Sequence, residues 1–358
     1  MSKANKGEWS EFYVFLKILS ERKLFAADNN LEVIPGKYFV FHRIIREEND
    51  GERKIYDFNG PDNQIQILDE KEEIIMMVND SSLPQKTKKI FEAIKNAGKG
   101  TFIIPEAREL MDQLLCEKVK ASGTRKEDII GIIDDRISPT PIELGFSIKS
   151  MLGGASTLLN AGDTTNFIFK VTGFKGDKNV VNIIDGKSKI RDRIKKIREM
   201  GGELIFVKPK NSVFAGNLRK IDTVFAKIIA NMLLDFYSGN ASFITALTIL
   251  LSRNSTLEEY GFSAMDFEYK IKNFLDSIAL GMVPSKEWDG NILALGGYIV
   301  VKENGDVVCY HLYNRDEFRT YLFENTKFET ASSTRHGFGS LYEEGGELFF
   351  NLNLQIRF

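Results

Sequence analysis

The sequence predicts a mixed α/β fold of the α+β type, with a central sheet flanked by helices and an appended lobe of helices and a β-hairpin. Its 358 residues, 43% of them hydrophobic, suffice for two packed units or for one large core with such a lobe. Helical and strand-like runs are mixed over residues 1–210, whereas residues 211–358 contain helices first and strands afterwards. We therefore expect one unit over residues 1–210 and a second over residues 211–358.

The first 120 residues predict a helix, several strands and two further helices. An opening helix is indicated by apolar residues at helical spacing, namely Trp9, Phe12, Leu16 and Leu19. Apolar runs separated by turn-rich segments then predict strands at residues 37–45, 53–58, 64–68 and 72–78. Pro84 and Pro105 each precede a helical segment, the first over residues 87–97 and the second ending near Val119.

Residues 127–150, EDIIGIIDDRISPTPIELGFSIKS, predict two apolar strands joined by a turn. An acid, Asp128, opens the first strand and a lysine, Lys149, closes the second. Because residues two apart share a face of a strand, each of these side chains belongs to a defined face of the hairpin. A turn centred on residues 138–141 would place Lys149 opposite the neighbourhood of Ile130, one step from Asp128.

The rest of the chain predicts strands, then helices, then strands again. Residues 151–163 suggest a turn and a short helix, and strand-like runs follow at residues 165–173, 179–184 and 203–208. Helical stripes come next, at residues 218–236, 242–251 and 267–275. An apolar hairpin around Asn304 and Gly305 and a strand region over residues 347–358 close the sequence.

Composition excludes several kinds of site. Cys116 and Cys309 lie far apart without CxxC partners, so we expect reduced, packed thiols rather than a zinc site. The three histidines are scattered, which does not suggest a histidine metal cage. No run approaches the roughly 18 apolar residues of a membrane span, and the N-terminus has no signal-peptide pattern, so we expect a cytoplasmic protein.

The net charge of −2 gives no overall attraction to polyanions, so any DNA contact must come from a local basic cluster. One such cluster is KSKIRDRIKKIR, residues 187–198, where seven basic residues accompany only Asp192. Ile190, Ile194 and Ile197 recur there at helical spacing, which equally predicts an amphipathic helix with a solvated basic face. The two interpretations are compatible.

Asp128 and Lys149 on paired strands suit phosphodiester hydrolysis. This reaction needs an in-line water and neutralisation of the charge that builds on the phosphate, and Mg²⁺ held by carboxylates supplies both. Asp128 is the candidate metal ligand, the carbonyl of Ile148 could complete the metal shell, and Lys149 could orient the water and stabilise charge. Each residue alone is an ordinary strand-end residue, and only their combination favours a site.

A more specific signal follows this hairpin. GFSIKSMLGGASTLLNAGDTTNFIF, with GEWSEFY near the N-terminus, ENGDVVCYHLYN, TASSTRHGFGSLY and the terminal LNLQIRF, resembles the HpaII-type restriction endonucleases nearly end to end. The resemblance implies a type II enzyme of the PD-(D/E)xK nuclease class that cuts double-stranded DNA within CCGG using Mg²⁺. It also implies a restriction-endonuclease-like catalytic core in residues 1–210 and a role in DNA recognition or dimerisation for residues 211–358.

The chain departs from the pattern of that class at two positions. Ser147 stands where a carboxylate is expected two residues before Lys149, and Glu127 rather than proline precedes Asp128. The second metal carboxylate must therefore come from elsewhere in the fold.

Four acids are candidates for it. Asp163 follows Lys149 by fourteen residues, about the spacing at which other CCGG-core cutters take the carboxylate from a later helix. The class also often places a glutamate on its first helix, which here offers Glu11 and Glu8 as rival sources. Glu143 lies near the turn and is too far along its strand from Lys149 to act on the same phosphate. The choice between Asp163 and the first helix stays open.

A CCGG reader must contact guanine N7 and O6 and cytosine N4 through the major groove. Two polar loops, residues 156–166 and 332–336, are the best candidates. Arg335 in the second loop offers a bidentate guanine contact. The full set of candidate DNA contacts is Ser147, Asn160, Thr165, Asn166, Arg335 and His336. Helix capping and an ordinary polar turn are the structural alternatives for the two loops.

The palindromic target implied by the resemblance predicts two active sites related by a two-fold axis, hence a homodimer on DNA. A cognate methyltransferase would act on the same sequence without having to bind the nuclease. Two other interpretations stay open, namely a sequence-specific DNA-binding protein without cleavage activity and a structure-specific repair nuclease. The first would bind CCGG without cutting it, and the second would cut without respect to CCGG.

Overall fold

The computed structural model describes residues 3–48, 51–61, 64–79, 81–121, 127–134, 141–154 and 156–358. The chain forms two compact units, Met1–Ser156 with Ile292–Tyr321 (unit 1) and Thr157–Asn291 with Leu322–Phe358 (unit 2). These units differ from the expected division at residue 210 in two ways. Residues 157–210 belong to unit 2 rather than to the first unit, and residues 292–321 join the sheet of unit 1. None of the described helices is long and apolar enough to cross a membrane.

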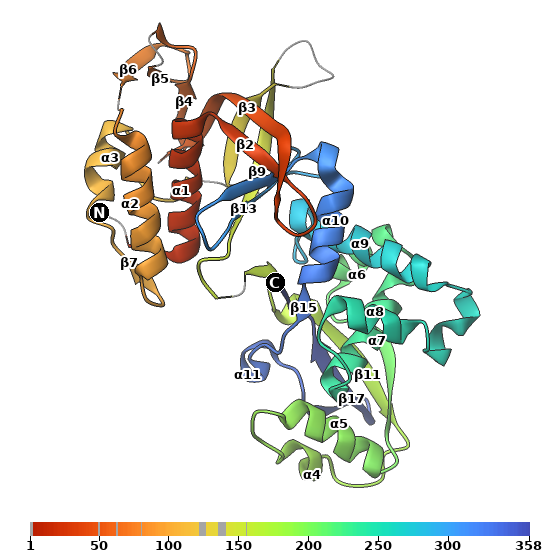
Figure 1. The fold of residues 1–358 in the computed structure, drawn as a ribbon. Coiled ribbons are helices and arrows are strands. Elements are labelled where there is room, and N and C mark those ends of the chain that lie inside the picture. The colour runs from red at the N-terminus through yellow and green to blue at the C-terminus, as the bar shows by residue number, and fades with distance from the viewer. Residues whose placement is uncertain are drawn as a thin grey trace. The chain divides into compact units, whose positions relative to one another are not determined.

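Unit 1 is built on a mixed sheet, which confirms the predicted α+β class (Figure 1). Its nine described strands lie in the order β2 (Lys23–Ala27), β14 (Val307–Tyr310), β13 (Gly297–Val301), β9 (Ile142–Ser150), β8 (Ile129–Ile133), β3 (Val33–Glu47), β4 (Arg53–Asp57), β5 (Ile65–Leu68) and β6 (Ile74–Val78). β13 pairs in parallel with β9, with Val300 opposite Lys149. This pairing explains why residues 292–321 belong to unit 1.

Helix α1 (Lys6–Glu21) confirms the predicted opening helix and supplies much of the core of unit 1. A capping box starts it, in which the Asn5 side chain accepts from the Glu8 main-chain NH and the Glu8 carboxylate accepts from Asn5 N. The predicted stripe is buried, and α1 packs against β9 and against α2 (Leu83–Asn96). The remaining short elements before β8 are β1 (Ala4–Asn5), β7 (Thr101–Phe102) and α3 (Ala107–Gln113).

Unit 2 contains two small sheets and most of the described helices. One sheet has the described order β12 (Glu203–Pro209), β11 (Asn166–Thr172), β17 (Glu347–Asn353) and β16 (Leu341–Glu344). The other joins β10 (Thr157–Leu159), β18 (Ile356–Arg357) and β15 (Lys327–Phe328). The helices are α4 (Lys178–Asn182), α5 (Lys189–Glu199), α6 (Ser212–Ile221), α7 (Phe225–Ser238), α8 (Ile244–Leu251), α9 (Ala264–Leu280) and α11 (Ser333–His336); α10 (Arg315–Asn325) crosses the sequence boundary between the units.

Three local predictions for this half were wrong. Residues 179–184 were expected as a strand, but the Asp177 side chain caps the N-terminus of α4 and outweighs the β-branched composition. The single helix expected over residues 218–236 is broken where Asp222 becomes extended and its carboxylate accepts from Val224 N. The short helix expected within residues 151–163 is instead the strand β10.

Candidate active site

The predicted hairpin forms, but its register differs from the expectation. β8 and β9 pair antiparallel with Ile133 opposite Ile142 and Ile130 opposite Gly145, not Lys149. Pro141 has no NH to donate, so the ladder begins one residue after it. Most of the expected turn, residues 138–140, lies outside the described residues.

Asp128 is fixed at the start of β8 by two hydrogen bonds to its carboxylate. Its Oδ2 accepts from Ile148 N at 2.7 Å and from the Ser147 hydroxyl at 3.3 Å. Asp128 N donates to Phe146 O at 2.8 Å, which continues the ladder. Lys149 lies two residues beyond Ser147, so it shares that face of β9. The hairpin therefore brings the predicted acid and lysine to one end of the sheet, although by another register.

Glu11 of α1 joins this acid. Lys120 Nζ contacts both carboxylates, at 3.2 Å from Glu11 Oε1 and 3.7 Å from Asp128 Oδ1. The Glu11 and Asp128 side chains are only 13% and 16% exposed, so they form a largely buried acidic pair. Glu11 Oε2 is buried and has no hydrogen-bond partner among the residues that the structure describes.

The charges of this cluster act on one another. Burial raises the pKa of Glu11 to about 7, and the Asp128 carboxylate adds to the rise, while Lys120 and Lys149 oppose it. Burial lowers the pKa of the Lys120 ammonium, but Glu11 and Asp128 outweigh this and leave it raised above its ordinary value. Lys149 is thus close enough to Glu11 to influence its ionisation.

The donor set fits a magnesium ion. Mg²⁺ is typically bound by one or two carboxylates together with waters and substrate phosphates rather than by a full protein cage. Glu11 and Asp128 supply two carboxylates, and the unpartnered Glu11 Oε2 is a buried acceptor that a cation would satisfy. Among the residues that the structure describes there is no cluster of three or more His, Cys, Asp or Glu side chains suited to a metal. The remaining ligands would come from the main chain, water and DNA.

The raised pKa of Glu11 predicts how the metal-free protein responds to pH. Its carboxyl titrates at about 7 when folded, against 4.5 as the ordinary value, so the folded state binds more protons between these pH values. The stability that this group contributes is therefore full below pH 4.5 and lost as the pH rises through about 7, by on the order of 3 kcal/mol. Urea denaturation in EDTA across this range measures it.

Glu11→Gln should remove this component, because glutamine does not titrate. Glu92→Gln, on an exposed position of α2, is the matched control and should keep the wild-type pH profile. A Glu11→Gln protein whose stability falls as steeply between pH 4.5 and 7 as the wild type's would contradict the assignment.

Comparison with known proteins decides the family. The model of the HpaII restriction endonuclease family matches residues 5–358. The chain is also 39% identical to the type II restriction enzyme HpaII of Haemophilus parainfluenzae, over 99% of this chain and 98% of that protein. The chain belongs to the HpaII restriction endonuclease family. No solved structure matches it.

Membership of the HpaII family makes the chain a type II site-specific deoxyribonuclease. This confirms the resemblance drawn from the sequence. It also removes the two rival interpretations, since neither a non-cleaving DNA-binding protein nor a repair nuclease is a restriction endonuclease.

Several predicted site residues of this family member have other roles in the structure. Ser147, expected at DNA, is 3% exposed and donates its hydroxyl to Asp128. Thr165 and Asn166, also expected at DNA, are fully buried. Asn353 donates to both of their side chains, at 3.2 and 2.8 Å. Burial and these internal bonds leave neither available for a direct DNA contact.

The other carboxylate candidates are engaged elsewhere. Asp163 belongs to unit 2, where its Oδ1 accepts from Lys210 Nζ at 2.6 Å. Glu143 lies opposite Ile132 and accepts from Arg53 at 2.9 Å. Glu8 closes the capping box of α1.

The two polar segments expected at DNA are partly available. Asn160 and Arg335 are exposed, and His336 is half-buried with its carbonyl accepting from Asn166. The segment 332–336 forms the short helix α11 rather than a plain turn, with the Ser332 hydroxyl accepting from Arg335 N.

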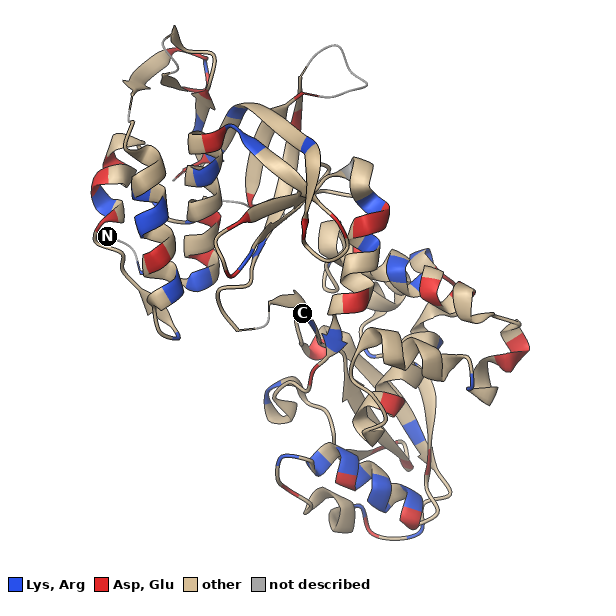
Figure 2. Cartoon of the chain, viewed as in Figure 1, with Lys and Arg blue, Asp and Glu red and all other residues tan. Residues whose placement is uncertain are grey.

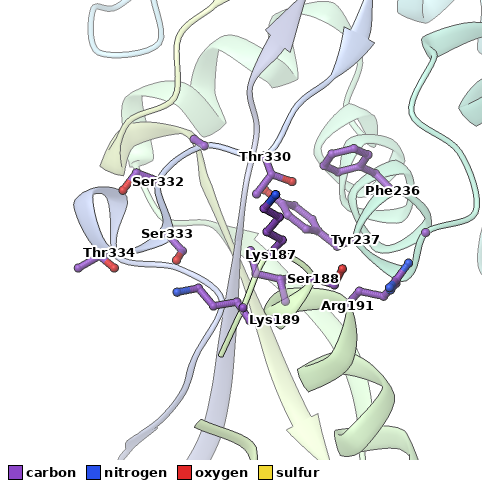
Figure 3. Close-up of a pocket in the computed structure, with 14 residues that line it drawn as sticks. Lys187, Ser188, Lys189, Arg191, Phe236, Tyr237, Thr330, Ser332, Ser333 and Thr334 are labelled. Atoms are coloured by element: carbon purple, nitrogen blue, oxygen red, sulfur yellow. The ribbon is translucent and has the colours of Figure 1, made fainter. Parts of the chain in front are cut away.

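Most of the basic segment forms α5, on which Lys and Arg recur along the helix (Figure 2). Its isoleucines are buried as predicted. Arg193 is also buried, donating to main-chain carbonyls that include Gly339 O at 2.6 Å. Lys187, Lys189 and Arg191 instead line a cavity of about 390 Å³ within unit 2 (Figure 3). Residues 330–334 also line this cavity. The structure thus brings the two predicted DNA-binding segments, basic and polar, to one cavity.

Lys120 is the site residue that sequence reasoning missed. It lies in no recognisable motif, and the sequence shows only a lysine eight residues before Asp128. Lys120 and Glu11 are 109 positions apart in the sequence. No local sequence pattern could therefore predict that they lie side by side.

Proposed function

We propose that this restriction endonuclease cuts double-stranded DNA at CCGG, using Mg²⁺ held by Glu11 and Asp128. The observation that carries the proposal is the convergence of these two shielded carboxylates with Lys149 at one end of the sheet. The CCGG target is supported by the relationship to HpaII and by the shared motifs. Glu11 is preferred to Asp163 as the second ligand because it adjoins Asp128 within unit 1, whereas Asp163 is paired with Lys210.

The residues divide the chemistry between them. Bound Mg²⁺ would supply an acidified water and neutralise phosphate charge. Asp128 is held in one orientation by Ile148 N and Ser147, so its remaining oxygen is aimed at the site without reorganisation. Lys149 would place a positive charge beside the attacked phosphate and orient the attacking water. The Ile148 carbonyl stays a candidate ligand.

The cavity of unit 2 that α5 and residues 330–334 line is proposed to hold the DNA backbone. Lys187, Lys189 and Arg191 provide positive charge, and Ser332 and the hydroxyls after it provide short donors for phosphate oxygens. Arg335 and His336 follow directly, and we propose that Arg335 contacts guanine. Asn160 remains a proposed DNA contact from its exposed position after β10.

A Lys187→Met/Arg191→Met double variant should weaken DNA binding about equally for CCGG and unrelated duplexes, because phosphate contacts carry no sequence information. The slope of log K against log salt should fall by about 1 for each phosphate interaction that the variant removes. Fluorescence anisotropy in Ca²⁺ at several salt concentrations measures both. Lys195→Met is the matched control, since Lys195 lies on the same helix and is 76% exposed but does not line the cavity. If Lys195→Met weakened DNA binding equally, the loss of affinity would reflect the lower positive charge of the protein and not the loss of contacts in the cavity.

Cleavage of a palindrome on both strands is best explained by a homodimer bound to DNA. Sedimentation with and without a CCGG duplex in Ca²⁺ tests this. A complex of one chain per duplex that still cuts both strands would overturn the dimer.

Plasmid cleavage tests the whole proposal. The protein should linearise a plasmid with one CCGG site in Mg²⁺, leave it intact in EDTA and leave a plasmid without CCGG intact in Mg²⁺. Asp128→Asn should not cut either plasmid. Cutting without divalent cation, or at another sequence, would refute the corresponding half of the proposal.

A further inference from the structure

Lys120 places an ammonium group between the two proposed metal ligands. Its Nζ lies 3.2 Å from Glu11 Oε1 and 3.7 Å from Asp128 Oδ1. A divalent metal bound at this site would likewise touch both carboxylates. The site therefore carries its own counter-charge.

We propose that Lys120 is a built-in counter-cation, which takes the place of the divalent cation in the metal-free enzyme and is displaced when that cation binds. The inference rests on the proposed metal-dependent function. It goes beyond that function by assigning Lys120 a role in metal affinity. The divalent cation must compete with the Lys120 ammonium for the two carboxylates.

The hydrogen bonds of the Glu11 and Asp128 carboxylate oxygens explain why a metal ion must displace the Lys120 ammonium. Asp128 Oδ2 already accepts two hydrogen bonds, so Oδ1 is the oxygen left for a cation, and this is the oxygen that faces Lys120. Glu11 Oε2 accepts no hydrogen bond from the described residues, while Oε1 accepts from Lys120. Two cations on the same pair of carboxylates would repel each other within a few ångströms, where the Coulomb term is large.

The burial of the three groups suits an exchange. The Glu11 and Asp128 side chains are 13% and 16% exposed, and each is carried by a core element. The Lys120 side chain is 48% exposed, so its ammonium can move into water while its stem stays in place. The ligands are thus fixed and the counter-cation is free to leave.

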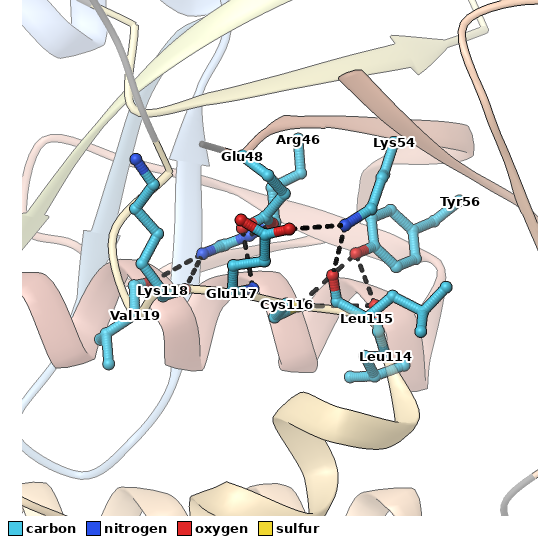
Figure 4. A network of polar contacts seen from close by, with 10 residues as sticks. All are labelled: Arg46, Glu48, Lys54, Tyr56, Leu114, Leu115, Cys116, Glu117, Lys118 and Val119. Atoms are coloured by element: carbon cyan, nitrogen blue, oxygen red, sulfur yellow. Dashed lines mark hydrogen bonds and ion pairs between the residues drawn. The ribbon is translucent and has the colours of Figure 1, made fainter. Parts of the chain in front are cut away.

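The backbone that carries Lys120 is anchored just before it by a network of polar contacts (Figure 4). The buried Arg46 donates to the carbonyls of Lys118 and Val119, the latter at 3.0 Å. Glu48 accepts from Glu117 N at 3.0 Å. These contacts fix the chain up to the residue before Lys120, so its approach to the carboxylates is built into the fold.

A Lys120→Met variant distinguishes a counter-cation from an incidental surface lysine. Isothermal titration with Ca²⁺ should show binding tighter by on the order of tenfold, because the competing charge is gone. The metal-free melting temperature should fall, since two carboxylates are left without a counter-charge, and Ca²⁺ should raise it by more than in the wild type. Lys120→Arg, which keeps the charge, should bind Ca²⁺ close to the wild-type affinity.

Lys71→Met is the matched control, because Lys71 is an exposed lysine of unit 1 in the turn before β6. Ca²⁺ affinity of Lys120→Met that is unchanged or weaker relative to Lys71→Met overturns the counter-cation role. If Lys120→Met does not fold without metal, Lys120→Gln is titrated in the same way and judged by the same criterion.

Asp128→Asn separates this inference from the proposed function. If the wild type binds no Ca²⁺, or Asp128→Asn binds it as well, the metal site itself is wrong. If Asp128→Asn loses Ca²⁺ while Lys120→Met matches Lys71→Met, only the role of Lys120 is wrong.

Discussion

Replacing Lys149 by methionine is expected to slow cleavage at CCGG by about 10²–10³-fold, the usual effect of removing one stabilising donor from the reacting group. Methionine keeps the length and apolar stem of lysine on β9 but removes its charge. Binding of a CCGG duplex in Ca²⁺ should stay near the wild-type affinity, because the proposed metal ligands and the proposed DNA-binding cavity of unit 2 are untouched. Single-turnover cleavage in Mg²⁺ and anisotropy in Ca²⁺ measure the two effects separately.

Lys37→Met is the control for this variant, since Lys37 is an exposed strand lysine of unit 1 that contacts none of the acidic pair. It should cut at the wild-type rate. Wild-type cleavage by Lys149→Met would remove Lys149 from the chemistry, and loss of DNA binding in step with cleavage would make it a binding residue instead.

Glu48→Gln is expected to destabilise unit 1 by about 3–5 kcal/mol, the usual cost of breaking a buried ion pair. Glu48 is fully buried and accepts from Arg46 Nε at 2.5 Å, while Arg46 itself is 5% exposed. Glutamine would leave the Arg46 charge buried without compensation. It would also loosen the segment before Lys120, because the second oxygen of Glu48 binds Glu117 N.

The measurement can be confined to unit 1, because the two tryptophans of the chain fall one in each unit. In a Trp288→Phe background, the fluorescence of the buried Trp9 reports on unit 1 during urea denaturation. Glu47→Gln, on the adjacent and more exposed position of β3, is the control and should shift the midpoint little. Equal shifts for the two variants would show that the buried pair does not stabilise the unit.

Local periodicity correctly predicted several elements that bury one face. The stripe of α1, the isoleucines of α5 and the two apolar strands around Asp128 and Lys149 all follow from spacing alone, since burial imposes periods of 3.6 and 2 on the sequence. It failed at residues 179–184 and 222–224, where single capping aspartates outweigh composition. Such caps act through one side-chain hydrogen bond, which average propensities do not represent.

The sequence by itself determined the family and the mixed fold, and it singled out Asp128 and Lys149 as candidate site residues with Ser147 where a carboxylate is expected. Only the tertiary structure shows which candidate acid lies beside Asp128, because the packing of α1 on β9 brings Glu11 to it. It likewise decided that residues 292–321 join unit 1, that Thr165 and Asn166 are buried, and that Lys120 lies between the acids. The physical reason is the same in each case. The spacing of apolar residues predicts that one face of an element is buried, but it does not show which distant segment covers that face.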